Sequence, residues 1–143
     1  MKTTTIILFE MLFFVMLANA QHVMLVPTIE KTVACSQYGS QLLLETKGHW
    51  SFGAFYQTSW QQTVEGIQTV NPFYGITINA PLIKSDRINF YFNIRGGIVN
   101  QHFFVIAPGL ETKLKISKRL GVSTLMSVRM TYPSASLKIY ITL

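Results

Sequence analysis

The sequence predicts an all-β fold, an antiparallel up-and-down barrel of about eight strands. Apolar and polar residues alternate along most of the chain, turn-forming residues separate the alternating stretches, and no stretch has a helical period. The clearest alternation covers residues 87–95, where one parity is apolar and consists of Ile88, Phe90, Phe92 and Ile94. Since successive side chains of a strand point to opposite faces, this strand has one apolar and one strongly polar face.

The composition fits a single domain in an apolar environment. The chain has 143 residues, and only 13% of them are charged, whereas about 25% is usual in soluble domains. Aromatic residues are frequent, with 10 Phe, 6 Tyr and 2 Trp. The net charge is +6, but no basic run is longer than Lys118-Arg119, so we expect no nucleic-acid binding. With one cysteine and three scattered histidines, we also expect no metal site and no cofactor.

The N-terminus has the pattern of an export signal. Lys2 precedes an apolar run that extends to Leu17 and is interrupted by Glu10, and the small-residue motif Ala18-Asn19-Ala20 follows. This order of positive, apolar and small residues is typical of a secretory signal peptide, and the apolar run is short for a membrane-spanning helix. We therefore predict a signal peptide over residues 1–20 and a single β-barrel domain over residues 21–143.

The first half of the predicted domain contains three strands. Residues 21–30 alternate weakly, and Pro27 predicts an irregular, edge-like strand there; residues 31–37 are predicted to form a loop. Residues 38–47 form a second strand that ends near Gly48. The third strand covers residues 50–60, with Trp50 and Trp60 on one face. Tilted by about 40°, it separates the two indoles by roughly 25 Å, the spacing of the aromatic girdles of membrane barrels.

The second half contains five further strands. A fourth strand begins at Asn71-Pro72 and ends near residue 80, and the fifth covers residues 87–95 and is expected to end at Gly96-Gly97. Residues 102–116 form a sixth strand in which Pro108-Gly109 predicts a bulge, a bend or a break. The seventh covers residues 120–130, and the eighth residues 135–143.

The pattern of charges and connections favours a barrel in lipid over a soluble sheet. From Trp50 onward, every charged residue falls in a connection or on the polar parity of a strand. Connections 31–37, 61–70, 96–101 and 131–134 are predicted on one side, and most are longer than connections 48–49, 81–86 and 117–119 on the other. Short turns on one side and longer loops on the other are typical of outer-membrane barrels, and an even strand number lets the sheet close.

These features make residues 21–143 resemble the small eight-stranded outer-membrane barrels of Gram-negative bacteria, the OmpA-domain and OmpX-like class. The resemblance is architectural. It implies a location in the outer membrane, with lipid and lipopolysaccharide as partners. It also implies that the last strand, residues 137–143, is recognised by the outer-membrane assembly machinery, although it ends in Leu143 where an aromatic residue is commoner.

An eight-stranded barrel has an interior that side chains just fill. We predict a salt-bridged plug there rather than an anion-conducting path. The charged residues expected to point inward are Glu45, Arg87, Arg95, Glu111, Lys113, Lys115, Arg129 and Lys138.

Three functions remain open from the sequence. The first is a non-enzymatic outer-membrane barrel with a structural or surface-interaction role, its outer loops 61–70 and 96–101 meeting a partner or lipopolysaccharide. The second is a soluble periplasmic or secreted barrel or sandwich that binds a small apolar ligand within its apolar face. The third is a lipid hydrolase, since His49 and Ser51, with Glu65 nearby, resemble the His-x-Ser and Glu of outer-membrane lipid A deacylases.

Overall fold

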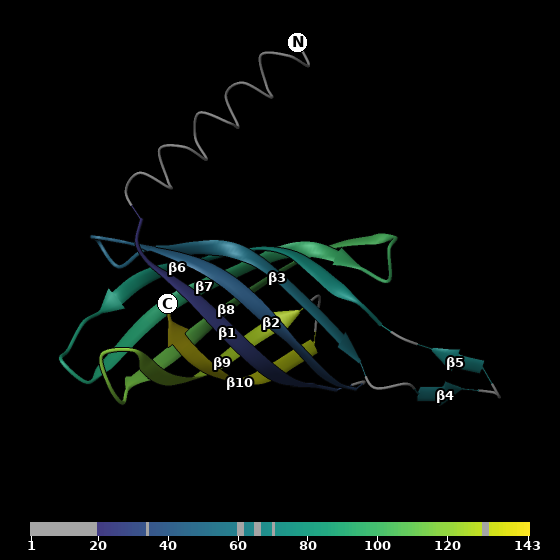
Figure 1. Ribbon diagram of the computed structural model, residues 1–143. Helices are drawn as coiled ribbons and strands as arrows, with labels where there is room; N and C mark the ends of the chain where they lie inside the picture. The colour runs from purple at the N-terminus through teal and green to yellow at the C-terminus, as the bar shows by residue number, and fades with distance from the viewer. Residues whose placement is uncertain (1–19, 34, 60–61, 65–66, 70, 130–131) are drawn as a thin grey trace, which may run out of the picture.

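The structure is a closed eight-stranded antiparallel β-barrel, which confirms the predicted fold class (Figure 1). The computed structural model describes residues 20–33, 35–59, 62–64, 67–69, 71–129 and 132–143. The barrel strands are β1 (Ala20–Thr32), β2 (Ser36–Thr46), β3 (Ser51–Ser59), β6 (Phe73–Ile83), β7 (Ile88–Val99), β8 (Phe103–Lys115), β9 (Leu120–Arg129) and β10 (Tyr132–Thr142). Each strand pairs with its neighbours along the chain, and β10 pairs with β1 to close the barrel.

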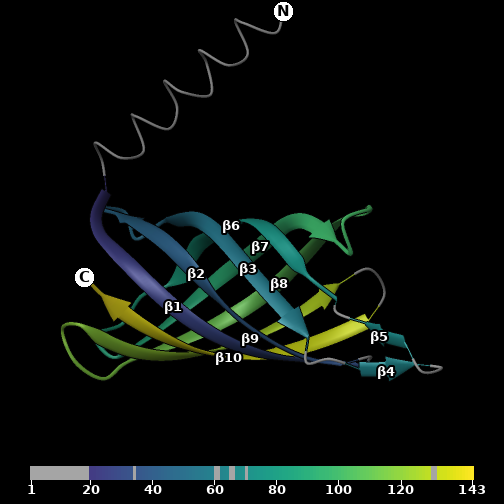
Figure 2. The same ribbon diagram turned by 45° about the vertical axis from the view of Figure 1, so that its right-hand side comes forward.

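The structure describes one residue of the predicted signal peptide, and it has two short strands in the predicted loop over residues 61–70. Of the predicted signal peptide over residues 1–20, Ala20 begins β1 and the remaining residues lie outside the described residues. The long connection between β3 and β6 contains a small two-stranded sheet, β4 (Gln62–Val64) with β5 (Ile67–Thr69), where a loop was predicted. This hairpin projects beyond the end of the barrel that is opposite to the start of β1 and the end of β10 (Figures 1 and 2).

The first strand is a full member of the barrel and not an irregular edge. It pairs with β2 on one side and with β10 on the other. The pairing with β10 passes from Leu25 to Thr28 and skips Val26 and Pro27. The missing N–H of Pro27 therefore falls where that ladder is already interrupted, so the proline is tolerated inside the sheet.

Gly96 and Gly97 do not end the fifth predicted strand. They pair with Ile76 and Gly75 on β6, and β7 continues to Val99. A Cβ atom on Gly97 would lie 2.2 Å from the carbonyl oxygen of Tyr74, whereas one on Gly96 would lie 3.8 Å from its nearest neighbour. Gly97 therefore allows a close approach of two bent strands in a narrow barrel, which is a role of glycine that local sequence does not separate from a turn.

The segment around Pro108 is continuous strand. β8 pairs with β7 from Phe103 to Leu114, including Pro108 with Ile94, and its pairing with β9 begins at Gly109. Pro108 therefore precedes the β9 ladder and deprives it of no hydrogen bond.

Of the four connections on the side predicted to carry longer loops, one is longer than the connections on the other side. The strands extend further than predicted, so connections 33–35, 100–102 and 130–131 are as short as connections 47–50, 84–87 and 116–119. The connection over residues 60–72 is long. We call the end of the barrel with connections 47–50, 84–87 and 116–119 the turn end, and the opposite end, which carries the hairpin, the loop end.

The alternation of side chains follows the predicted faces. In β7, Tyr91, Asn93 and Arg95 are buried inside the barrel, and the apolar residues of the other parity, Ile88, Phe90, Phe92 and Ile94, are exposed on its outside. Among the described residues, no helix is long and apolar enough to cross a membrane.

Candidate functional site in the barrel interior

Buried polar and charged side chains line the barrel interior together with apolar ones such as Leu43 and Phe73. They include two charged pairs, Arg95 with Glu30 and Lys138 with Glu111, and the four side chains of these pairs are at most 1% exposed. Glutamines, serines, threonines and asparagines from the inward parity of the strands surround them. Burying such groups is costly unless each charge is paired and hydrogen-bonded, so the contacts of the two pairs decide how the interior is built.

The Arg95 pair crosses the lumen. Around the closed barrel β7 lies opposite β1, because three strands separate them in either direction. Arg95 on β7 donates from Nη1 to Oε2 and from Nη2 to Oε1 of Glu30 on β1, the second bond at 3.0 Å. It also donates to Gln57 Oε1 on β3 at 3.2 Å and to Ser127 Oγ on β9 at 2.8 Å. A fork of this geometry suits a buried carboxylate, and here it connects four strands.

The Lys138 pair lies along one wall. Lys138 Nζ on β10 is 2.8 Å from Glu111 Oε2 on β8. The other oxygen of Glu111 accepts from Ser123 Oγ on β9 at 2.7 Å and from the Tyr140 hydroxyl on β10. Strands β8, β9 and β10 are consecutive in the barrel, so this cluster stabilises one part of the wall and makes no bridge across the lumen.

Two predicted lumen residues, Arg87 and Lys115, lie at the turn-end rim of the barrel and not deep in the lumen. Arg87 is exposed in the connection before β7, and Lys115 is exposed at the last position of β8. Both have the inward parity, but they lie at the rim of the turn end, beyond the part of the barrel that encloses side chains. Parity predicts the face of a strand and not the height at which the barrel stops.

The remaining predicted lumen residues lie at the two mouths. At the turn end, Lys113 Nζ is 4.1 Å from the centre of the Tyr140 ring, and Glu45 is 9% exposed. At the loop end, the half-buried Arg129 stacks on Phe73, with 4.8 Å from its guanidinium carbon to the ring centre.

Glu30 is the site residue that the sequence reasoning missed. It continues the inward parity of Met24, Val26 and Thr28 on β1 and is fully buried. Glu30 is the last residue of the predicted first strand, and the weak alternation of that strand concealed its inward face. Extending the parity of Met24 by six residues would have placed its carboxylate inside the barrel.

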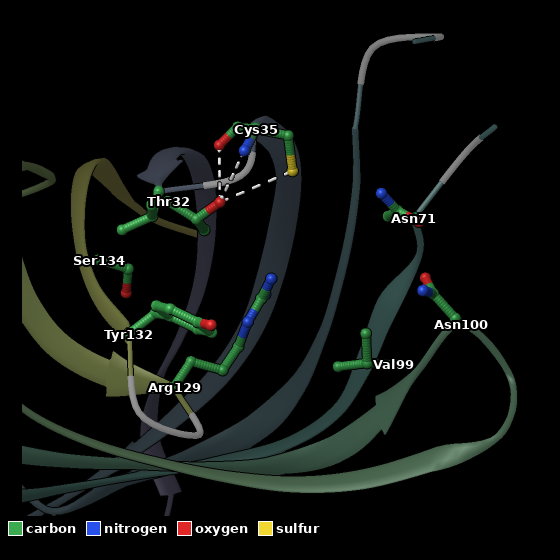
Figure 3. A pocket seen from close by; sticks show the side chains of 9 residues that line it. Thr32, Cys35, Asn71, Val99, Asn100, Arg129, Tyr132 and Ser134 are labelled. Carbon is green, nitrogen blue, oxygen red and sulfur yellow. Dashed lines mark hydrogen bonds between the residues drawn. The ribbon is translucent and has the colours of Figure 1, made fainter. Parts of the chain in front are cut away.

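The loop-end mouth contains a pocket of about 410 Å³ (Figure 3). The guanidinium of Arg129 extends into it from β9, and Cys35 and Val99 lie on other sides of it. Arg129 Nη1 donates to Gln37 Oε1 at 2.8 Å, and Gln37 Nε2 donates to the Asn71 carbonyl at 3.0 Å. These two bonds fix the position of one edge of the guanidinium.

The structure describes some of the residues predicted for the aromatic girdle and for the hydrolase site, and not the others. Trp50 is 47% exposed directly before β3, and Trp60 and Glu65 lie outside the described residues. His49 has a φ of 64° in the turn before β3, and its Nδ1 is 2.9 Å from Glu45 Oε1. Ser51 is 4% exposed at the start of β3. Within the described ranges, no group of three His, Cys, Asp or Glu residues could hold a metal ion.

Comparisons with known proteins find a likeness of fold alone. No family model matches the sequence, and no curated protein matches it. Among solved structures, the chain resembles one described as "De novo design of transmembrane beta-barrels", with a TM-score of 0.71 and 8% sequence identity. The likeness covers 87% of this chain and 97% of that one. At this identity the shared feature is the eight-stranded closed barrel.

Proposed function

We propose that this chain is a non-enzymatic β-barrel protein of the outer membrane, with an apolar outer belt in contact with lipid and an interior plugged by charged side chains. Its role in this proposal is structural or is an interaction at the cell surface. Lipid and lipopolysaccharide are its surroundings, and the assembly machinery recognises residues 137–143.

The apolar outer belt is the observation that carries the proposal. Each barrel strand exposes at least one large apolar side chain on the outside, for example Leu25, Leu42, Tyr56, Ile76, Phe92, Ile106, Met126 and Ile139. Soluble monomers rarely expose a contiguous apolar patch larger than about 300–600 Å². A belt that surrounds the whole barrel would therefore be unfavourable in water and is favourable in the hydrocarbon of a bilayer.

The strand lengths and the polar interior support the same proposal. The barrel strands have between 9 and 13 residues, and a tilted membrane-spanning strand needs about 9–11. A soluble barrel with an apolar ligand inside requires apolar residues on the inner face. The inner face here has apolar residues such as Phe55, Phe73 and Leu125, but two buried charged pairs lie among them, Arg95 with Glu30 and Lys138 with Glu111, and the apolar face of β7 points outward.

The depth dependence of a charge on the outer face tests lipid contact. Ile94 is 39% exposed near the middle of β7, and Ile116 is 57% exposed in a turn-end connection. In a bilayer, Ile94→Arg should destabilise the barrel by about 2–4 kcal/mol and Ile116→Arg by about 0–1 kcal/mol. The measurement is urea unfolding in vesicles, together with the fraction of protein that stays in membranes after alkali extraction and migrates faster on a gel when unboiled.

A soluble protein would give a different result. Both isoleucines are exposed, so both substitutions would then be nearly neutral, and the wild-type protein would appear in the periplasmic fraction without detergent. Fractionation with inner membranes would contradict the outer-membrane location while leaving lipid contact intact.

The absence of catalysis is part of the proposal. The Ser51 side chain is buried, and the His49 ring contacts Glu45. We expect no release of lipid A acyl chains by the wild-type protein. Release that disappears in Ser51→Ala, with Ser59→Ala on the same strand as the control, would overturn this part and favour the hydrolase.

The long β3–β6 connection is the segment proposed to contact a surface partner or lipopolysaccharide. Its hairpin projects from the loop end, whereas β1 begins and β10 ends at the turn end (Figures 1 and 2). An epitope inserted between residues 65 and 66 should bind antibody on intact cells, and one inserted between residues 117 and 118 at the turn end should not. The opposite pattern would reverse the orientation.

A further inference from the structure

We propose that the loop-end pocket binds a small amphiphilic carboxylate, with its carboxylate on the Arg129 guanidinium and its apolar body against the walls of the pocket. This inference rests on the pocket and its charge, and it does not depend on which membrane surrounds the barrel.

The charge of Arg129 has no carboxylate partner of the kind that the deeply buried cations have. The two fully buried cations of the interior each have a carboxylate partner, Glu30 for Arg95 and Glu111 for Lys138. Within the described residues, Arg129 forms no salt bridge, and both carboxylate oxygens of Glu30 accept bonds from Arg95. Arg129 is thus a half-buried cation whose direct contacts, Gln37 and the Phe73 ring, are neutral, while the attraction of Glu30 acts from beyond salt-bridge distance and is opposed by Arg95.

Arg129 has N–H donors that are available to a ligand. A guanidinium has five N–H donors, and Gln37 accepts from one nitrogen, Nη1. The group extends into the space between Cys35 and Val99, as Figure 3 shows. Gln37 is itself fixed by the Asn71 carbonyl, so the guanidinium is held in place before a ligand arrives. Such a preorganised fork is suited to a carboxylate, which it can bind through two parallel bonds.

The size and lining of the pocket suit a small ligand with an apolar body. Its volume of about 410 Å³ falls within the range of about 300–1,000 Å³ for small-molecule sites. Val33, Val99 and Tyr132 contribute apolar surface. One unpaired cation in mostly apolar surroundings favours a monoanion with an apolar body over a multiply charged phosphate, because extra negative charge would be buried without a partner.

The opposite mouth lacks this combination. The cavity at the turn end is smaller, about 140 Å³, and its lining contains Glu45 together with Lys113, Lys115 and Lys118. Its cations have a carboxylate of the chain beside them, and Lys115 and Lys118 are exposed to solvent, where a charged contact contributes little. The larger pocket with its half-buried arginine is therefore the better anion site.

The test is a titration of the full mature chain, refolded in detergent micelles, with sodium hexanoate and, separately, with hexanamide. The two probes have the same chain length and differ in charge. Backbone amide NMR shifts give both the affinity and the location, with Val33 and Val99 as reporters of the pocket. We expect hexanoate to bind at least about tenfold more tightly than hexanamide, since hydrogen bonds to charged groups are the stronger ones.

Two arginine variants locate the effect. Arg129→Gln should lower the affinity for hexanoate to that for hexanamide, and Arg87→Gln, an exposed arginine at the turn end, should leave it unchanged. Equal affinity for the two probes, shifts confined to the outer belt, or unchanged hexanoate binding by Arg129→Gln would each overturn the proposal. If Arg129→Gln fails to fold, the comparison of the two probes on the wild-type protein still decides the outcome.

Discussion

The two buried ion pairs have the same chemistry and different geometry. Arg95 and Glu30 join strands on opposite sides of the barrel, whereas Lys138 and Glu111 lie on β10 and β8, separated by one strand. The first pair therefore crosses the lumen, in its loop-end half, and links opposite walls. The second pair satisfies the charges of one wall. Since both pairs are equally buried, we expect their positions in the topology to decide what the removal of each does to the whole barrel.

The largest effect is expected from removal of the cross-lumen arginine. Arg95 donates to both carboxylate oxygens of Glu30, so Arg95→Met leaves a buried carboxylate without its cation. Unfolding in urea should show a loss of about 3–5 kcal/mol, the usual cost of breaking a buried pair. The double variant Glu30→Leu with Arg95→Met should regain most of that stability, and failure to regain it would show that the Gln57 and Ser127 bonds of Arg95 matter more than the charge.

Removal of Lys138 should be less harmful. After Lys138→Met, Glu111 still accepts hydrogen bonds from Ser123 and Tyr140, so its charge stays partly satisfied. We expect a loss of about 2–3 kcal/mol in the same urea experiment. A loss equal to or larger than that of Arg95→Met would break the comparison between the two pairs.

Conductance should separate the two pairs without reference to stability. An eight-stranded barrel has an interior that its side chains just fill. We expect the wild-type protein and Lys138→Ala to be silent in planar bilayers, and Arg95→Ala to show small ion currents because it removes the side chain that crosses the lumen. Equal currents from both variants would contradict the assignment of the plug to the cross-lumen pair.

The two adjacent glycines of β7 test the geometry that positions Arg95. Gly97→Ala brings a Cβ to 2.2 Å from the Tyr74 carbonyl oxygen, whereas Gly96→Ala meets only ordinary contact at 3.8 Å. We expect a loss of about 1–3 kcal/mol for Gly97→Ala and almost none for Gly96→Ala. The measurement is again urea unfolding, and similar values for both variants would mean that β7 and β6 can separate locally without cost.

The smallest effect is expected from a single hydroxyl in the wall cluster. Tyr140→Phe removes one of the three side-chain donors to Glu111 and keeps the ring against Lys113. The expected loss is about 1.5 kcal/mol, at the low end for a hydrogen bond to a charged group. A much larger loss would show that the wall cluster is as sensitive as the cross-lumen pair.

The faces of the strands could be predicted from the sequence because the two environments of the barrel differ so strongly. In β7 and β10 the alternation of apolar and polar residues identified which side chains point outward, and the structure has the same faces. Strand ends were predicted less well. Pro27, Gly96 and Gly97 were interpreted as local breaks, but pairing with neighbouring strands outweighs these local preferences.

The partners inside the lumen could not be predicted from the sequence. Arg95 and Glu30 are 65 residues apart, and alternation gives the face of each but not its height in the barrel. Height depends on the register of every intervening strand pair, since each shift moves a residue along the axis. For the same reason Arg87 and Lys115 have the inward parity and still lie at the rim.

The cross-lumen pair also constrains the order in which the barrel can form. Glu30 lies on the first barrel strand and Arg95 on a strand in the middle of the chain, and their side chains meet only when the sheet has curled round far enough to bring β1 opposite β7. An open sheet in a bilayer would expose both charges, and the unpaired edges of β1 and β10, to hydrocarbon, where such groups are strongly disfavoured. Insertion and closure are therefore expected to be one cooperative event, with the guanidinium and the carboxylate entering the membrane only as a pair already enclosed by the wall.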